Sequence, residues 1–567
     1  MQKRWIIQKH DHDAARTLAA TLGVSPLAAA LLIARGPGTE EKALSFLNPS
    51  IDHLHEPYLL KGMREAVERV QKAIENGEKI LVWGDYDVDG TTGTTLLRKA
   101  IKILGGESVY HIPNRFTEGY GVNIPALEQA KANGVSLAIT VDCGIRSFAP
   151  LEWAKNNGLD VIVTDHHLSD EVRGNPPAFA VVNPNQPDCP YPDKHLAGVG
   201  VAFKLAHALL REKGLERMVP GFMKIAAIGT VADIMKLSGE NRAIVALGLR
   251  DLTNTSNYGL KALMEISDCR SDMKSYHIGF RIGPRINAAG RMDIARHVVE
   301  LFECEEFEPA RQLAAMLDSR NRERQRMQQQ ITEMALLETA NLFDSKFVVV
   351  AGEGWHRGVI GLAASRIAER LFRPTIVLSI DNGIAHGSAR SVGSFHLLNA
   401  LDNCSHLFEQ FGGHAAAAGM QIKTENIDPL RSALNAYAAE ALTDDDLVPI
   451  LNIDAHVSSA SLSLNLLDEL AGFEPYGAGN PKPVFVTKDL VIRDEPFVMK
   501  DKHLKFWLQN NEGKRFEAVW WDGVERSKGR TLSAGSRIEI AYTPEANTWN
   551  GNTRLQLVVE DLKTDNH

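Results

Sequence analysis

The sequence has few cysteines and lacks long apolar runs. Its 567 residues include five cysteines, which lie far apart and form no CxxC pair. This spacing excludes a disulfide framework and a zinc ribbon and indicates a reducing compartment. No run of about 18 apolar residues occurs, and the N-terminal stretch MQKRWIIQKHDHD has no signal-peptide core. The sequence therefore predicts a cytoplasmic protein that does not enter a membrane.

An excess of positive charge is also missing. Lysine and arginine number 62 against 71 aspartate and glutamate, a net charge of −9. Any nucleic-acid site must therefore be a local basic groove rather than a generally basic surface. Apolar residues make up 44% and charged residues 23%, as in ordinary globular proteins, and the length predicts about four domains.

Five segments differ in their patterns. Residues 1–55 are predicted to form short helices. Over 56–255, helices alternate with short β-branched strands, which predicts a parallel sheet with helices on both faces. Residues 256–345 combine an arginine-rich segment with a long connecting helix. A second α/β domain is predicted over 346–445, and the short strands and frequent turns of 446–567 predict a small OB-type β-barrel.

Carboxylates and imidazoles stand at the ends of three predicted strands. They belong to the stretches GDYDVDG, LAITVD and DVIVTDHH and are Asp85, Asp87, Asp89, Asp142, Asp165, His166 and His167. Because the carboxyl ends of parallel strands meet at one edge of a sheet, we expect these side chains to lie close together. A calcium loop is disfavoured, since the twelfth position from Asp85 is Leu96 rather than glutamate.

Such a cluster requires cations. Two unpaired carboxylates about 4 Å apart repel by roughly 4 kcal/mol at an effective dielectric constant of 20. Asp233, in the helical run GTVADIM, is a further candidate ligand. Oxygen ligands with one imidazole suit Mn²⁺ or Mg²⁺, and the absence of cysteine ligands argues against zinc.

These motifs resemble a known family. The ordered stretches GDYDVDG, VDCG, TDHH and TVADIM resemble the motifs of the DHH phosphoesterase superfamily, and RIGPRINAAGRM and FGGHAAAAGM resemble its RecJ family of single-strand-specific exonucleases. The resemblance spans about residues 60 to 565. It implies a DHH domain, a long connecting helix, a DHHA1-type α/β domain and a C-terminal OB-type barrel.

The resemblance also implies ligand roles for two divalent cations. Asp87 and Asp142 would hold one cation, and Asp89, Asp142, His166 and Asp233 the other. The pyrophosphatase branch has a histidine where this sequence has Trp83, whose indole cannot ligate a cation, so Asp85 or water fills that place. His167, with Asp165, is the catalytic candidate that binds or protonates a phosphate oxygen; the alternative is a packed histidine that supports the ligands.

Arginines mark candidate phosphate contacts. Between 281 and 296, four arginines face a single aspartate, and Gly283, Pro284 and Gly290 predict a loop there. Guanidinium groups bind phosphate in a bidentate manner. The candidates are Arg281, Arg285 and Arg291, together with Arg115 after a strand of the first domain, for which an ordinary salt bridge is the alternative.

The glycine-rich stretch FGGHAAAAG would let backbone approach a ligand closely at Gly412 and Gly413, with His414 beside them. Tight helix packing by the alanines is the alternative. The resemblance makes this stretch part of the domain that grips the nucleic acid opposite the metals, with His356, Ser388, Arg390 and Ser391 as further parts.

The barrel contains half of the eight tryptophans. Alternation in RFEAVW places Phe516 and Trp520 on one face and Trp521 on the other. Trp507, Trp521 and Trp549 are candidates for stacking with bases, and core packing is the alternative for each. One other motif is set aside: Gly198-Val199-Gly200 opens a helix, but Phe203 occupies the last place of a GxGxxG pattern.

The preferred hypothesis is a metal-dependent exonuclease that degrades single-stranded DNA from its 5′ end, with roles in recombination and repair that the family resemblance implies. One alternative is a DHH phosphodiesterase acting on short oligonucleotides or cyclic dinucleotides, and another is a non-catalytic scaffold at a replication fork. The family resemblance implies single-stranded DNA as the substrate, and a single-stranded-DNA-binding protein and a helicase as protein partners.

Overall fold

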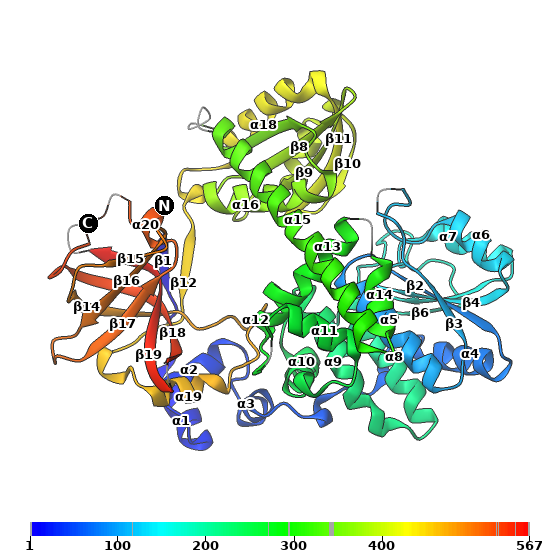
Figure 1. The fold of residues 1–567 in the computed structure, drawn as a ribbon, viewed down its shortest axis with the longest axis horizontal. Helices are drawn as coiled ribbons and strands as arrows, with labels where there is room; N and C mark the ends of the chain where they lie inside the picture. The colour runs from blue at the N-terminus through cyan, green and yellow to red at the C-terminus, as the bar shows by residue number, and fades with distance from the viewer. Residues whose placement is uncertain are drawn as a thin grey trace. The chain divides into compact units, whose positions relative to one another are not determined.

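The computed structural model describes residues 3–115, 117–269, 271–292, 295–339, 345–528, 530, 532–549 and 551–564. Two compact units make up the chain (Figure 1). One unit comprises His10–Asn321 and Asp468–Lys482, and the other Met1–Lys9, Arg322–Leu467 and Pro483–His567. The predicted long helix is α15 (Phe307–Thr339), which passes from one unit into the other.

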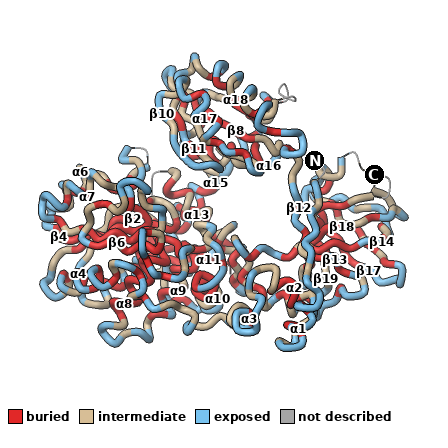
Figure 2. The backbone as a smooth tube through the Cα atoms, turned by 180° about the vertical axis from the view of Figure 1, so that it is seen from behind, coloured by how far each residue is buried: buried red, intermediate tan, exposed pale blue. Residues whose placement is uncertain are grey.

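A five-stranded parallel sheet forms the centre of the first unit. Its strand order is β3-β2-β4-β5-β6, with β2 (Lys79–Gly84), β3 (Ser108–His111), β4 (Val135–Val141), β5 (Asp160–Thr164) and β6 (Ala180–Val182). Residues of β2 alternate between two cores: Ile80 and Val82 pack into one, Leu81 and Trp83 into the other. Strands β2, β4 and β5 are buried along most of their length, whereas the edge strand β3 is half-buried (Figure 2). This confirms the predicted parallel sheet covered on both faces.

Helices of this unit cover both faces of the sheet and extend beyond it. One core includes residues of α4 (Met63–Glu75), α5 (Val88–Ile103) and α8 (Gly198–Glu212), and the other includes residues of α6 (Ile124–Ala132) and α7 (Phe148–Asn156). The remaining helices are α1 (His12–Leu22), α2 (Pro26–Ala34), α3 (Glu40–Leu47), α9 (Val219–Ala232), α10 (Gly239–Arg250), α11 (Tyr258–Ile266), α12 (Ser275–His277) and α14 (Arg296–Glu303).

The arginine-rich segment is helical, and the predicted loop is wrong. A π-helical turn η5 (Ile278–Ile282) leads into α13 (Gly283–Arg291). Pro284 lies in the first turn of α13, a position where proline is tolerated because the absence of its N–H breaks no hydrogen bond within that helix. The glycines permit close packing instead of ending the helix.

In the second unit, a mixed five-stranded sheet of order β10-β11-β9-β8-β7 lies between two cores. Its elements are β7 (Val348–Glu353), α16 (Arg357–Leu371), β8 (Thr375–Asp381), β9 (Ile384–Arg390), α17 (Leu397–Asn403), β10 (Phe408–Gly413), β11 (Ala417–Lys423) and α18 (Ile427–Ala441). The stretch FGGHAAAAG is the hairpin between β10 and β11, not a helix.

The C-terminal strands form a closed barrel, as predicted. Strands β14 (Phe485–Ile492), β18 (Arg537–Trp549), β19 (Asn552–Thr564), β17 (Arg515–Trp520) and β16 (His503–Gln509) pair in that order, and a β14–β16 pairing completes the ring. Strands β13 (Ala455–His456) and β15 (Phe497–Met499) lie at its ends, with helices α19 (Leu464–Ala471) and α20 (Gly523–Arg526) nearby in sequence.

The start of the chain differs from the helical expectation. Residues Arg4–Ile7 form strand β1, which pairs in parallel with β12 (Ile450–Ile453). Tryptophan and two isoleucines favour extended backbone, but the partner strand lies far away in sequence.

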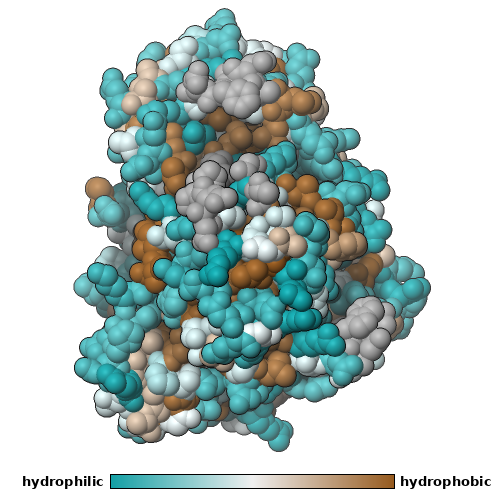
Figure 3. Space-filling view, turned by 90° about the vertical axis from the view of Figure 1, so that its left-hand side faces the viewer, coloured by the Kyte–Doolittle hydropathy of each residue, from teal (hydrophilic) through white to brown (hydrophobic). Residues whose placement is uncertain are grey.

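Among the described residues, no single helix has the length and apolar character of a membrane span; only α1 with α2, bent by 111°, passes on length and composition together. On the face drawn in Figure 3, hydrophilic residues predominate and hydrophobic ones form separate patches.

Segment 468–482, which belongs to the first unit although it is distant in sequence, is held there by a buried arginine. The guanidinium of Arg242 in α10 donates to the carbonyl oxygens of Phe46, Gly472, Phe473, Glu474 and Pro475 at 2.8–3.4 Å. Its side chain is 2% exposed, and burial lowers its pKa to about 10. Because the group stays charged at neutral pH, these are charge-assisted bonds.

Replacing Arg242 with methionine should destabilise the first unit by about 3 kcal/mol, since several buried carbonyl groups lose a charged donor. Pulse proteolysis in urea, with fragments from 468–482 followed, measures the change. Arg250→Met, an exposed position of the same helix, is the matched control and should shift stability little. Equal stability of both variants would contradict this role of Arg242.

Candidate metal centre

Acidic and imidazole groups converge where the central strands end. Asp85 follows β2, Asp142 follows β4, and Asp165 follows β5, and these three strands are neighbours in the sheet. Asp87 caps the first turn of α5 by accepting from the N–H of Gly90 at 3.0 Å. The predicted cluster at the carboxyl edge of the sheet is therefore present in the structure.

Three groups of side chains could each hold a cation. Their ligand atoms lie within 4.8 Å of one another: Asp85, Asp87 and Asp142; Asp89, His166 and Asp233; and Asp142, His166 and His167. His166 Nε2 lies 3.1 Å from Asp142 Oδ1, 3.7 Å from Asp233 Oδ2 and 3.8 Å from Asp89 Oδ2. Asp142 thus lies between two adjacent groups.

The pKa values of this cluster are shifted because its groups are buried without a positive counter-charge. Burial, then the charge of neighbouring aspartates, raises the pKa values of Asp85, Asp89 and Asp142 well above their usual range. Burial lowers the pKa of His166 to about 4, so its imidazole is neutral near pH 7. Among the described residues, Asp85 Oδ1 is a buried oxygen without a hydrogen-bond partner, and the buried Asp142 Oδ1 has the ring nitrogen of His166 3.1 Å away. Buried carboxylate oxygens and a neutral imidazole are suitable ligands for a divalent cation.

Asp89 is held by the start of helix α8. Its carboxylate accepts from the N–H groups of Gly198 at 2.6 Å and Val199 at 2.7 Å, where the helix dipole favours negative charge. A Cβ on Gly198 would lie 2.5 Å from Asp142 Cβ, so this position requires glycine. The Gly-Val-Gly stretch that sequence analysis set aside therefore positions two candidate ligands.

Asp165 positions its neighbours instead of joining a cation group. It accepts from the N–H groups of Ile145, His166 and His167 at 2.7–3.1 Å and lies 2.7 Å from His167 Nδ1. Burial alone would lower the pKa of His167, but the hydrogen bond and charge of Asp165 outweigh it and raise that pKa. The His167 side chain is 47% exposed, so its ring is accessible from outside.

Trp83 lies away from the cation groups. Its buried ring packs in the core with Leu127 and Cys143, and its centroid lies 4.3 Å from that of His111. Asp85 is instead the side chain that shares a group with Asp87 and Asp142.

Helix α13 packs directly on the acidic segment 84–90. A Cβ on Gly290 would lie 2.2 Å from the carbonyl oxygen of Tyr86, and Asn287 Oδ1 accepts from the N–H of Val88 at 3.2 Å. Sequence reasoning missed both roles, because Gly290 was interpreted as a loop residue and Asn287 carried no signal.

Three domain families match separate ranges of the chain. The DHH family N-terminal domain matches residues 79–230, the DHHA1 domain 344–440 and the RecJ OB domain 453–561. The single-stranded-DNA-specific exonuclease RecJ of Bacillus subtilis is 40% identical over 564 residues, which cover 98% of this chain and 70% of that protein. The chain belongs to the RecJ family of single-stranded-DNA-specific exonucleases.

Solved RecJ structures agree with this assignment. The structure of RecJ from Thermus thermophilus in complex with Mn²⁺ superimposes with a TM-score of 0.84 at 32% identity, covering 99% of this chain and 79% of that one. Its complex with Mg²⁺ gives a TM-score of 0.78 at 29% identity, covering 99% and 78%. These relatives bind the two cations that the sequence predicts for this chain, and membership of the family favours an exonuclease over the two alternatives.

The predicted arginines differ in their surroundings. Arg115 is exposed and lies over the ring of Tyr86, 5.1 Å from its centroid, next to the metal centre. Arg281 donates to the carbonyl oxygen of Asp268 at 2.8 Å. Arg285 donates to the buried carboxylate of Asp318 at 2.9 Å, which makes a structural ion pair its principal contact. Burial raises the pKa of Tyr86 to about 12, and the nearby positive charge of Arg291 opposes this rise.

The DHHA1 domain presents a bare strip of backbone beside polar side chains. Gly412 lies opposite Gly419, which lies opposite Ser388, and a Cβ on either glycine would meet nothing within 4 Å. Arg390 donates to Ser388 Oγ at 3.0 Å. A backbone or phosphate could therefore approach the sheet closely here.

Four other predicted residues lie in the same domain. His356 caps α16 by accepting from the N–H of Gly358 at 3.1 Å, and burial lowers its pKa. Ser391 Oγ donates to the carbonyl oxygen of Phe395 at 2.6 Å. Gly413, with φ 155°, lies at the hairpin, where a Cβ would meet Ala417 O at 2.3 Å, and His414 is exposed next to it.

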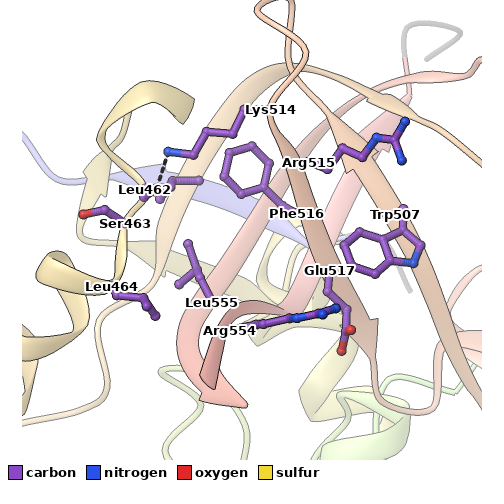
Figure 4. A pocket seen from close by; sticks show the side chains of 10 residues that line it. All are labelled: Leu462, Ser463, Leu464, Trp507, Lys514, Arg515, Phe516, Glu517, Arg554 and Leu555. Atoms are coloured by element: carbon purple, nitrogen blue, oxygen red, sulfur yellow. Dashed lines mark hydrogen bonds between the residues drawn. The ribbon is translucent and has the colours of Figure 1, made fainter. Parts of the chain in front are cut away.

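A pocket of about 310 Å³ opens on the OB barrel (Figure 4). Trp507, half-buried, lines it together with Phe516, Arg515 and Arg554, so an aromatic ring and cationic groups face one cavity. Trp521 is 50% exposed, whereas Trp520 is buried, as the alternation predicted. The side chain of Trp549 lies outside the described part of the chain.

Gly290→Ala should reduce exonuclease activity at least about 100-fold while leaving the protein folded. The new methyl group would displace the backbone at Tyr86, and small misplacements of a catalytic group are costly. Initial rates and Mn²⁺ affinity by calorimetry measure the effect. Gly221→Ala, in helix α9 with nothing within 4 Å of the new methyl, is the control. Unchanged activity of Gly290→Ala would disprove the tight contact.

Metal-free protein should lose stability as the pH rises from about 4 to about 7. Burial, then the charge of Asp87, raises the pKa of Asp233 from its ordinary 3.8 to about 7. The folded state therefore holds a proton that the unfolded state releases, and its stabilising effect disappears through this range. Thermal unfolding with EDTA against pH measures this loss, which Asp233→Asn should reduce and Mn²⁺ should offset. A parallel pH profile for the variant would contradict it.

Proposed function

We propose that this chain hydrolyses single-stranded DNA from its 5′ end, with two divalent cations at the centre built around Asp142. The observation that carries the proposal is the buried carboxylate cluster, in which Asp142 belongs to one cation group with Asp85 and Asp87 and to another with His166 and His167, and in which Asp85 Oδ1 is buried without a hydrogen-bond partner. Membership of the RecJ family supports the substrate and the reaction.

The ligand roles follow the two groups. Asp85, Asp87 and Asp142 would hold one cation, and Asp89, His166 and Asp233 the other. Asp142, whose Oδ1 lies 3.1 Å from His166 Nε2, would contribute to the second site as well. Bound cations would neutralise the phosphodiester and lower the pKa of an attacking water. The neutral imidazole of His166 suits ligation, because a protonated ring offers no lone pair.

His167 is proposed to serve the substrate directly. Asp165 fixes its ring through Nδ1 and raises its pKa, so Nε2 carries a proton more often near neutral pH than an isolated histidine would. That proton can be donated to a phosphate oxygen or to the leaving oxygen. Asp165 acts by positioning and charging His167.

The protein residues that contact the DNA strand are proposed from the chemistry of their side chains. Arg115 is proposed to bind a phosphate near the metal centre, because it is exposed and lies over the ring of Tyr86, whereas Arg285 is engaged by Asp318 and Arg281 by a backbone carbonyl. Ser388, Arg390 and the glycine strip of the DHHA1 domain are proposed to hold the backbone. Trp507 and Trp521 of the barrel are proposed to stack with bases.

The proposal includes the cellular compartment, the process and the protein partners. Five thiols without disulfides among the described residues suit the cytoplasm. Recombination and repair are the processes that supply single strands to such an enzyme, and a single-stranded-DNA-binding protein and a helicase are the proposed partners.

Asp142→Asn should abolish cleavage yet keep the fold and strand binding. Asparagine accepts the left-handed backbone at this position (φ 62°) but removes the shared charge. Digestion of 5′-labelled and 3′-labelled single and double strands, with Mn²⁺, Mg²⁺ or EDTA, measures activity, strand choice and direction. Asp188→Asn, another left-handed aspartate, is the control. Cleavage by Asp142→Asn, or 3′-first release by the unmodified protein, would overturn the proposal.

A further inference from the structure

The residues that follow Asp233 lie against a segment that is distant in sequence. Helix α9 ends at Ala232, and Asp233 is its capping residue. A few residues later, the N–H of Leu237 donates to the carbonyl oxygen of Ala478 at 2.8 Å. Ala478 belongs to segment 472–480, which is called the strap from here on. The turn that carries a candidate metal ligand is therefore hydrogen-bonded to the strap.

Two glycines of the strap allow this close approach. A Cβ on Gly477 would lie 2.7 Å from Cδ1 of Leu237, which is buried in a hydrophobic core. A Cβ on Gly479 would lie 3.3 Å from Cβ of Lys236. Strap and turn thus leave no room for a further methyl group without displacing one of them.

The strap is itself held firmly. Arg242 donates to carbonyl oxygens between Phe46 and Pro475, four of which belong to the strap. Within the strap, Asn480 is 1% exposed, and its side-chain amide donates to the carbonyl oxygens of Phe473 at 2.7 Å and Pro475 at 2.9 Å. Because these buried bonds fix its backbone, the strap can act as a support for the turn.

The backbone at Ile234, between Asp233 and the strap contacts, depends on such a support. Its φ is 58°, in the left-handed region that β-branched residues rarely adopt. Its side chain is 75% exposed, so burial of that side chain does not offset the cost. A residue in this conformation persists where the surrounding structure fixes the chain on both sides. Helix α9 fixes the chain before Ile234, and the strap fixes it after Ile234.

We propose that the strap positions Asp233 for cation binding by keeping the turn at Ile234 in its left-handed conformation. The proposal rests on the proposed function, in which Asp233 is a ligand of the second cation. Asp233 Oδ2 lies 3.7 Å from His166 Nε2, within a group that could hold this cation. Where the strap contacts are weakened, Ile234 relaxes and moves Asp233 away from His166. The affinity for the second cation is therefore set in part by the strap.

The first test weakens the contact between strap and turn. Gly479→Ala should lower the affinity of one Mn²⁺ site about 10-fold and leave the other unchanged, because alanine is strained at φ 72° and its methyl group presses on Lys236. Calorimetric titration of the full chain with Mn²⁺ measures both sites, and electron paramagnetic resonance shows whether the two ions remain paired. Gly214→Ala is the matched control, since φ is 67° and nothing lies within 4 Å of the new methyl group.

Further variants show whether the strap acts through Asp233. Asp233→Asn identifies the affected site, and adding Gly479→Ala to it should cause no further loss of Mn²⁺ affinity. Ile234→Gly should restore most of the affinity lost in Gly479→Ala, because glycine keeps the left-handed conformation without support. Gly477→Ala, which adds a methyl group against Leu237 without left-handed strain, should weaken the same site.

The outcomes separate the strap from the proposed function. The strap is refuted if Gly479→Ala and Gly477→Ala bind Mn²⁺ like the control, if they weaken both sites equally, or if their losses add to that of Asp233→Asn. A lower thermal stability with unchanged Mn²⁺ binding refutes it as well, since a purely structural segment would behave in that way. If the unmodified protein binds two Mn²⁺ ions but cleaves no DNA, the proposed function fails while the strap stands.

Discussion

Electrostatic repulsion between buried carboxylates is the constraint on which the rest of this structure depends. Asp85, Asp89 and Asp142 lie in a region that excludes most water, where charged carboxylates cannot persist without a counter-charge. Their raised pKa values show the strain that the metal-free protein carries. Bound cations would supply the missing counter-charge, and the surrounding helices hold the carboxylates in place.

Close backbone packing keeps the acidic groups together. Glycines at three helix positions let main chain approach the cluster: Gly198 beside Asp142, Gly229 beside Asp89 and Gly290 beside Tyr86. A methyl group at any of these places would lie within about 3 Å of another heavy atom. The buried charge thus depends on the close approach of α8, α9 and α13 to the strand ends.

The proposed substrate contacts are divided among parts with different chemistry. The metal centre offers carboxylates and imidazoles, the DHHA1 sheet offers bare backbone with Ser388 and Arg390, and the OB barrel offers Trp507 with two arginines around a pocket. None of these reads base sequence, because phosphates, backbone and ring faces are common to every nucleotide. An enzyme that degrades strands of any sequence requires this division.

The sequence by itself determined the parallel sheet, the closed barrel, the long helix and the membership of the acidic cluster, because hydrophobic periodicity and strand-end position are local properties. It did not reveal that segment 281–292 is a helix packed on Tyr86, that the Gly-Val-Gly stretch holds Asp89, or that Arg285 is engaged by Asp318. It also could not pair β1 with β12. Each of these depends on contacts between residues far apart in the chain, and only the tertiary structure decides which surfaces meet.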